Sequence, residues 1–195
     1  MMLRALGLKL ILVLGLAACA APPAPQVQLG ADGRPLQTVY RISPVDAPRV
    51  RQRMQDGLNS LRQQNGLPPL TPNSRLASAA ATHARDMSFQ SRPWHWGSDG
   101  SSPMQRVSRA GYDGMLIGEL ISETFENEFE TVNAWMSEPE TRQVILDRRA
   151  QELGVGWHQD SNGKLWWTVV LGAPGRGADV VASTPSWDGF GGVGF

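Results

Sequence analysis

The sequence predicts an α+β domain, because helical and strand patterns alternate along its central part. Apolar residues recur at helical spacing in residues 43–66 and again in 73–87. Residues 115–124 alternate as a strand does, and two apolar runs near the end of the chain are joined by an Asn-Gly step, which is a strong hairpin signal. Of the 195 residues, 41% are hydrophobic, enough to build the core of one ordinary domain.

Two long helices are expected first. Ser43 is an N-cap residue followed by a proline, so a helix should begin there and end at Asn65-Gly66, with a buried face of Val50, Met54, Leu58 and Leu61. A second helix begins at Asn73 or Ser74, and its many alanines allow a neighbouring element to approach closely. His83 lies on the apolar face of this helix. We interpret it as a packed, hydrogen-bonded core residue rather than a ligand.

Shorter elements complete the domain. A short helix is expected over 102–111, where a serine cap and a proline begin it and a glycine ends it. A strand is expected over 115–124, and two helices over about 127–136 and 139–146. The final hairpin should turn at 161–163, whose sequence is Ser-Asn-Gly.

The N-terminal segment has the composition of an export signal. Arg4 and Lys9 precede the apolar run 10–16, which is too short to span a bilayer, so residues 1–18 are predicted to be a signal peptide. The single cysteine, Cys19, directly follows Leu-Ala-Ala, and this tetrad resembles the lipobox of bacterial lipoproteins, whose cysteine is diacylated. We therefore expect lipidation at Cys19 and anchoring to a membrane in the bacterial cell envelope, on its periplasmic or extracellular side. The alternative is plain secretory cleavage that leaves a free thiol.

Composition divides the mature chain into three parts. Residues 19–43 are rich in Pro, Gln, Gly and Ala and are predicted to be a flexible tether, 44–172 form the domain, and 173–195 are a Gly-rich tail. Basic and acidic residues both number 18, so nothing in the charge favours nucleic-acid binding.

The order of short motifs in the domain resembles the CAP superfamily, also called the SCP domain, of cysteine-rich secretory, venom-antigen and plant pathogenesis-related proteins. The motifs include "LASAAATHARDM", "HWGSDGSS", "GELI", "ETVNAWM", "PETRQVIL" and "ELGVGW", in the family order, and the similarity is closest to bacterial secreted members. The resemblance implies an α-β-α sandwich, in which helices cover both sides of a small, mostly antiparallel sheet.

The resemblance also implies a central cleft lined by two His and two Glu, which in some relatives hold a divalent metal such as zinc. By motif, the first His matches His95, the first Glu matches Glu119 and the second Glu matches Glu130. Thr141 stands where the family has its second His. A threonine hydroxyl is a poor zinc ligand, so no cofactor is expected to be required, and His95, Glu119 and Glu130 should hold zinc only weakly. His158 is not expected to replace the missing ligand.

The same residues could instead form a rigid polar core. Glu119 and Glu130 could cap backbone amides or pair with arginines such as Arg106 or Arg142, while His95 hydrogen-bonds one of the carboxylates. The tryptophans also divide. The core is expected to contain Trp135, Trp157 and Trp167, whereas the pair beside His95, Trp94 and Trp96, could form an aromatic wall for a ligand.

Three functions are consistent with these features. The leading hypothesis is a non-enzymatic, lipid-anchored binding module whose cleft, formed by His95, Glu119, Glu130 and Thr141, takes a small molecule, lipid or peptide; the sequence has no Ser or Cys nucleophile motif. The alternative is a hydrolase in which His95 or a weakly held metal activates water and a glutamate acts as general base. The third is a purely structural envelope protein.

Overall fold

The computed structural model describes residues 39–175, which contain five helices and four strands. The helices are α1 (Ala47–Gln64), α2 (Ser74–Gln90), α3 (Pro103–Arg109), α4 (Glu128–Ser137) and α5 (Pro139–Ile145). The strands are β1 (Thr71–Pro72), β2 (Met115–Thr124), β3 (Glu152–Gln159) and β4 (Leu165–Ala173). The predicted signal peptide 1–18, Cys19, most of the tether and nearly all of the tail lie outside the described residues.

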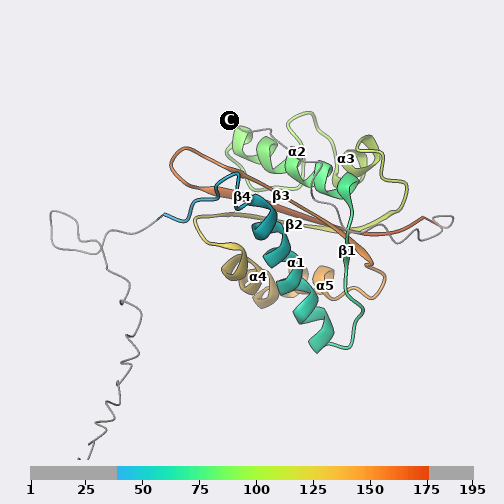
Figure 1. Cartoon of the computed structure of the whole chain (residues 1–195). Helices are drawn as coiled ribbons and strands as arrows, with labels where there is room; N and C mark the ends of the chain where they lie inside the picture. Colours follow the sequence, from blue (N-terminus) through green and yellow to red (C-terminus); the bar gives the residue numbers. More distant parts are fainter. Residues whose placement is uncertain (1–38, 176–195) are drawn as a thin grey trace, which may run out of the picture. The chain divides into compact units, whose positions relative to one another are not determined.

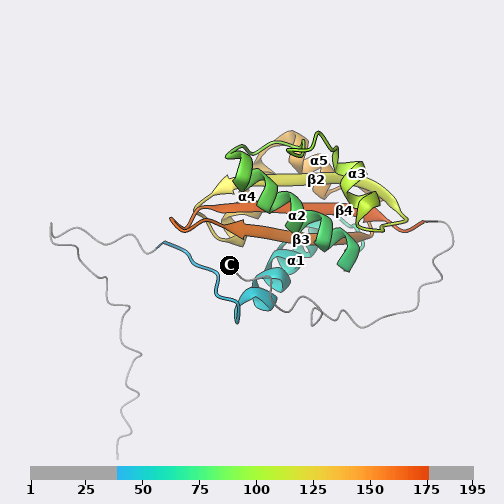
Figure 2. The same cartoon turned by 90° about the horizontal axis from the view of Figure 1, so that it is seen from above.

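The elements form three layers, as Figures 1 and 2 show. The strand order is β1-β3-β4-β2; β4 pairs antiparallel with both β3 and β2, and the two-residue β1 pairs parallel with β3. Helices α2 and α3 cover one face of the sheet, and α1, α4 and α5 cover the other. The predicted α-β-α sandwich with a mostly antiparallel sheet is therefore confirmed. The sequence does not predict β1, because two residues are too few to show an alternating pattern.

Helix α2 lies close to β3 because both elements have small residues where they meet. A Cβ on Gly154 would lie 2.1 Å from the backbone nitrogen of Ala77, and one on Gly156 would lie 2.2 Å from that of Ala81. The alanines of α2 and the glycines of the "GVGW" segment thus remove the side chains that would separate helix from strand. The close approach predicted from the alanines is made to β3.

The larger core lies between the sheet and α1. The helix buries Val50, Met54 and Leu58 as predicted, and it also buries Arg62 completely. The Arg62 guanidinium donates hydrogen bonds to four backbone carbonyl oxygens, those of Pro68, Ile145, Asp147 and Ala150. Burial of this charge is tolerated because its donors are satisfied.

The tryptophans predicted for the core are found there. Trp135 and Trp167 are buried, and Trp157 packs against the same cluster with its ring 5.6 Å from that of Trp167. The guanidinium of Arg51 lies over the Trp157 ring, 4.9 Å from its centre, and covers the outer side of this pair.

The domain begins earlier than the composition indicated. Tyr40 and Ile42, at the end of the predicted tether, pack against the larger core. The Gln159 side chain accepts a hydrogen bond from Ile42 N–H and donates one to the carbonyl of Tyr40. Residues 39–43 therefore belong to the folded domain. Within the described part of the chain, no helix combines the length and apolar character needed to cross a membrane.

Candidate functional site

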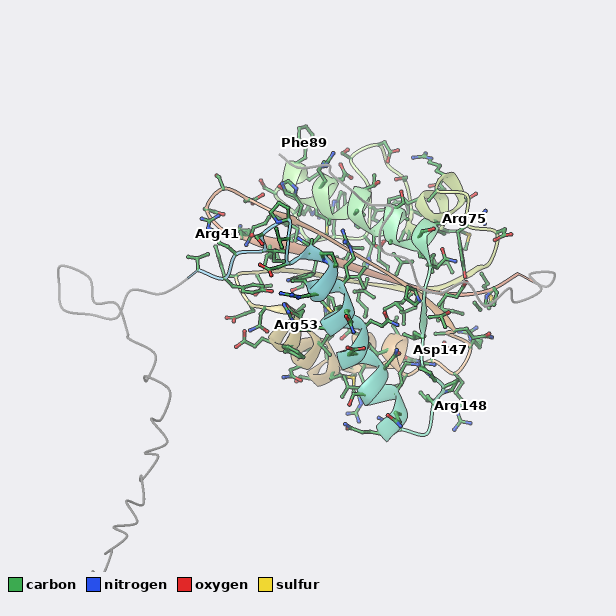
Figure 3. The ribbon with its side chains drawn as sticks, in the orientation of Figure 1. Arg41, Arg53, Arg75, Phe89, Asp147 and Arg148 are labelled. Atoms are coloured by element: carbon green, nitrogen blue, oxygen red, sulfur yellow. The ribbon has the colours of Figure 1, made fainter. Side chains whose placement is uncertain are left out.

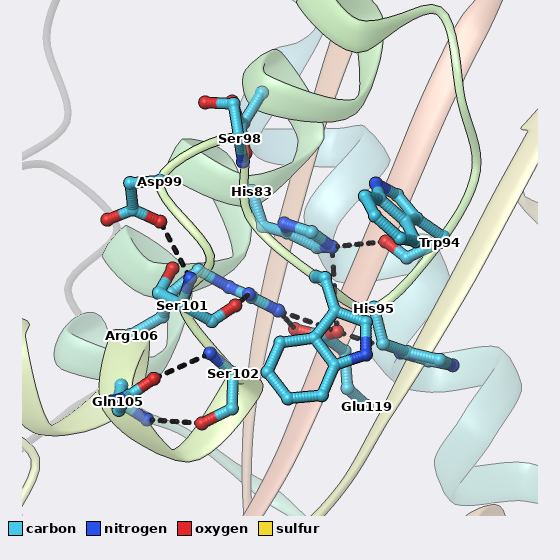
Figure 4. Close-up of polar contacts among 12 residues, drawn as sticks. His83, Trp94, His95, Ser98, Asp99, Ser101, Ser102, Gln105, Arg106 and Glu119 are labelled. Carbon is cyan, nitrogen blue, oxygen red and sulfur yellow. Dashed lines mark hydrogen bonds and ion pairs between the residues drawn. The ribbon is translucent and has the colours of Figure 1, made fainter.

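A buried carboxylate, Glu119, is the centre of a polar cluster between the sheet and the α2–α3 layer (Figure 4). It lies on the edge strand β2, and its side chain is 2% exposed. The Arg106 guanidinium on α3 donates through Nη2 to both carboxylate oxygens, at 2.9 and 2.8 Å. The His95 Nδ1 atom lies 2.9 Å from Oε1, and the Nε2 atom of the fully buried His83 lies 3.6 Å from the same oxygen. Three segments of the chain thus meet at one carboxylate.

The loop between α2 and α3 fixes His95 in place. The carbonyl oxygen of the preceding residue, Trp94, lies 2.9 Å from His83 Nε2, and the Trp94 indole donates to Gln90 on α2. On the other side, Ser102 caps α3 in a capping box with Gln105, which sets the direction from which Arg106 enters. His95 is therefore held at both ends of its loop by helix side chains.

The hydrogen-bond partners determine the histidine tautomers. His95 donates from Nδ1 to the carboxylate, so in the neutral ring Nε2 carries the lone pair. The His95 side chain is 51% exposed, which leaves part of the ring open to solvent. His83 donates from Nε2 to the Trp94 carbonyl, and among the described residues its Nδ1 atom is buried without a hydrogen-bond partner.

The charges of the cluster balance one another. Burial alone would raise the pKa of Glu119, but the His95 hydrogen bond and the charge and hydrogen bonds of Arg106 outweigh it, so the pKa lies below its usual value. Burial lowers the pKa of His83, which favours its neutral form. A buried Arg106–Glu119 ion pair therefore forms the base of the site, with His95 as its exposed member.

Two of the predicted cleft residues lie elsewhere. Glu130 is exposed on the first turn of α4, where its carboxylate caps the backbone N–H of Asn127 and its hydrogen bond raises the pKa of Glu126. Thr141 is on α5 and donates its hydroxyl to the backbone carbonyls of Trp135 and Glu138. Helices α4 and α5 cover the opposite face of the sheet from α2 and α3 (Figure 1). The structure therefore brings together His95 and Glu119 but not Glu130 or Thr141.

The assembled residues do not fit a divalent ion. The described residues contain no group of three or more His, Cys, Asp or Glu side chains arranged to hold a metal. Both oxygens of Glu119 already accept hydrogen bonds from Arg106, whose positive charge opposes a cation at the same place.

Two residues of the cluster were not in the predicted cleft. The sequence suggests Arg106 only as a partner of a glutamate in a rigid polar core. The Arg106–Glu119 pair of that polar core is present. His83 is the packed, hydrogen-bonded core residue that its helical position predicted, yet it also faces the site carboxylate. His158 lies away from the cluster, on β3, with Nε2 3.6 Å from Asp160.

The two tryptophans beside His95 differ. Trp94 is half-buried, and the guanidinium of Arg92 lies 3.8 Å from the centre of its ring. Trp96 is 51% exposed and presents an open aromatic surface next to His95 in the chain. Of the predicted aromatic wall, Trp96 is the more open member.

Comparison with known proteins agrees with this architecture. The model of the cysteine-rich secretory protein family, CAP, matches residues 55–171. No curated protein has a sequence that matches the chain. Among solved structures, an outer surface protein of Borrelia burgdorferi is similar with a TM-score of 0.61 and 18% identity, over 71% of this chain and 100% of that one.

Two further bacterial structures are similar over a part of their length. An extracellular protein of Bacillus anthracis that contains an SCP domain has a TM-score of 0.59 and 20% identity, over 68% of this chain and 44% of that one. A cysteine-rich secretory protein of Staphylococcus aureus has a TM-score of 0.54 and 18% identity, over 74% of this chain and 44% of that one. At these identities the likeness concerns the fold. The chain spans less than half of these two proteins.

Proposed function

This chain belongs to the cysteine-rich secretory protein (CAP) family, and we propose that it is a binding module of the bacterial cell envelope, held to a membrane by a lipid at Cys19. The three bacterial proteins of similar structure are described as outer-surface, extracellular and secretory, which agrees with an envelope or extracellular location. The ligand class is a small polar molecule or a peptide that contacts the open face of His95.

The state of Glu119 is the observation that carries this proposal. Its carboxylate accepts hydrogen bonds from Arg106 and His95, and its pKa is below the usual value, so it is a poor proton acceptor near neutral pH. Within residues 39–175 the hydrogen bond to Glu119 is the only one that His95 makes, so no hydroxyl or thiol nucleophile is bonded to the ring. What faces outward is part of the His95 ring, and the next residue in the chain, Trp96, is also exposed; exposed aromatic side chains are suited to binding.

Native mass spectrometry of the purified protein tests the binding role. Wild-type protein, isolated from envelope fractions or incubated with fractionated envelope extract, should retain a bound small molecule. His95→Ala should lose it while its circular dichroism stays unchanged. Ser108→Ala, at an exposed position on α3, is the matched control and should retain the ligand. If the wild type binds nothing, or His95→Ala binds equally well, the binding role is wrong.

One observation favours hydrolysis as the second candidate. The 2.9 Å contact between His95 Nδ1 and Glu119 is the arrangement by which a carboxylate orients a histidine that acts as general base. A hydrolase would lose turnover of peptide or ester substrates in His95→Ala. A binding module would show no turnover before the substitution.

The anchor has its own test. Cys19→Ser should convert a protein that partitions into detergent with the membranes into one released in soluble form, because a diacyl group supplies the membrane affinity. A matched Ser43→Ala variant should remain with the membranes. If Cys19→Ser still partitions into detergent, the lipid anchor is wrong.

A further inference from the structure

A concave site lies between α2 and α3, outside the His95 site. It is a cavity of about 610 Å³, closed on one side by the loop that carries Ser98, Asp99 and Ser101. Its α2 wall is a single stripe of the helix, Ser78, Thr82, Arg85 and Phe89, at helical spacing. Cavities of about 300–1,000 Å³ are typical of small-molecule sites.

The two carboxylates of this groove are used by its own wall. Asp86 accepts hydrogen bonds from the backbone N–H of Ser98, at 2.7 Å, and from the side chain of Gln90. Asp99 accepts from the N–H of Ser101, at 2.9 Å, and from the guanidinium of Arg109. These bonds fasten the loop to α2 and α3, so neither acid is left to attract a cation.

The polar groups of the groove that have no partner among the described residues can donate hydrogen bonds. Arg85 is exposed and makes no ion pair or hydrogen bond with any described residue, so none of these residues occupies its guanidinium. The Ser98 hydroxyl, on the facing loop, is likewise without a partner among residues 39–175. A guanidinium matches a carboxylate in a bidentate geometry, and a hydroxyl can donate to or accept from a peptide amide.

The apolar part of the groove is open at one end. Phe89 is 84% exposed at the end of α2, one helical turn beyond Arg85, and it projects away from the domain in Figure 3. Ala79 and Ala110 line the interior without bulk. Because Phe89 lies one helical turn from Arg85, a ligand with an anionic group and an apolar side chain could place the first at Arg85 and the second at Phe89.

We propose that this groove binds the free carboxylate end of a short peptide that carries an apolar side chain. Arg85 receives the carboxylate, the Ser98 hydroxyl pairs with a peptide amide, and Phe89 contacts the apolar side chain. The site is separate from the His95 site. The side chain of Arg106 lies between them, lining the groove along its length while its guanidinium bonds Glu119.

Calorimetric titration of the purified full chain with N-acetyl-leucyl-alanine tests this site, with the carboxy-terminal amide of the same dipeptide as the neutral probe. Wild-type protein should bind the acid, and the amide should bind at least about tenfold more weakly, because it loses a charge-assisted hydrogen bond. Arg85→Gln should weaken binding of the acid to the same extent, and Phe89→Ala should weaken acid and amide alike.

Two controls separate this site from other effects. Arg148→Gln removes an equally exposed arginine at the opposite end of the domain (Figure 3) and should leave the affinity unchanged. Arg85→Gln should still retain the ligand of the His95 site in native mass spectrometry, so the two proposals can fail separately. The proposal is overturned if the wild type does not bind the acid at millimolar concentration, if acid and amide bind equally, or if Arg85→Gln binds as the wild type does.

Discussion

Two buried glutamates, Glu119 on β2 and Glu128 at the start of α4, are each held by an arginine, but on opposite faces of the sheet. Both side chains are 2% exposed. Glu128 bonds Arg53 on α1 and the hydroxyl of Tyr40, at 2.7 Å, and so fastens the N-terminal segment to the domain. Glu119 bonds Arg106 and His95. A buried Arg–Glu pair alone therefore does not identify a functional site.

The two clusters differ in their third residue, which is Tyr40 beside Glu128 and His95 beside Glu119. Burial and the Glu128 hydrogen bond raise the pKa of Tyr40 to about 12, so its hydroxyl remains a donor at any physiological pH. The His95 side chain, by contrast, is half exposed. The Glu128 cluster is a fixed fastening, whereas the Glu119 cluster ends in a side chain that a ligand can reach from the solvent.

Removing each arginine should give the largest difference in stability. Arg106→Ala leaves Glu119 buried without its main partner, since Arg106 is itself only 6% exposed, and we expect the free energy of unfolding to fall by about 3–5 kcal/mol. Arg53 is 39% exposed, so water can replace it, and Arg53→Ala should cost about 1 kcal/mol. Urea unfolding measures both. Equal losses would mean that the two pairs are energetically equivalent.

Local sequence signals predicted most of the fold, whereas the site depends on contacts between residues that are far apart in the chain. Strand β2 was predicted with its observed ends, and both cap residues of α2 and α3 were visible in the sequence. Backbone capping by Glu130, one of the alternatives for this residue, also has a local signal, the Asn127-x-x-Glu130 spacing of a capping box. Which arginine would reach Glu119 could not be read from spacing, because the pairing depends on how α3 packs on the sheet.

Acidification should reduce the stability contributed by the Glu119 cluster before that of the Glu128 cluster. The pKa of His83 is lowered in the folded state, so the unfolded chain binds a proton that the fold excludes, and stability falls as the pH drops below the ordinary histidine value of 6.5. Glu119, also with a lowered pKa, adds a second loss below its ordinary value of 4.5. Tyr40 and Arg53 do not titrate in this range.

Unfolding free energies at pH 7.5 and 5.5 test this asymmetry. His83→Gln keeps a donor for the Trp94 carbonyl but cannot titrate, so its stability should depend less on pH than that of the wild type. Tyr40→Phe should keep the wild-type pH dependence. If His83→Gln retains the full loss on acidification, another group is responsible.

Tyr40→Phe itself should have an intermediate effect. It removes a hydrogen bond to a buried carboxylate, and we expect a loss of about 1.5 kcal/mol together with faster amide exchange in residues 39–43. Hydrogen exchange followed by mass spectrometry would locate the change. An equal increase in exchange across the whole domain would show that Glu128 does not fasten this segment in particular.

His95→Ala should have the smallest effect on stability and yet the clearest effect on function. The His95 side chain is 51% exposed, and Arg106 still bonds both oxygens of Glu119 after the substitution, so we expect a loss below about 1 kcal/mol in urea unfolding. A residue retained for stability alone would show the reverse, with a large loss in unfolding and unchanged ligand retention. A small cost combined with loss of the bound ligand would therefore assign His95 to binding and Arg106 to the support of Glu119, a division of roles that the Glu128 cluster does not have.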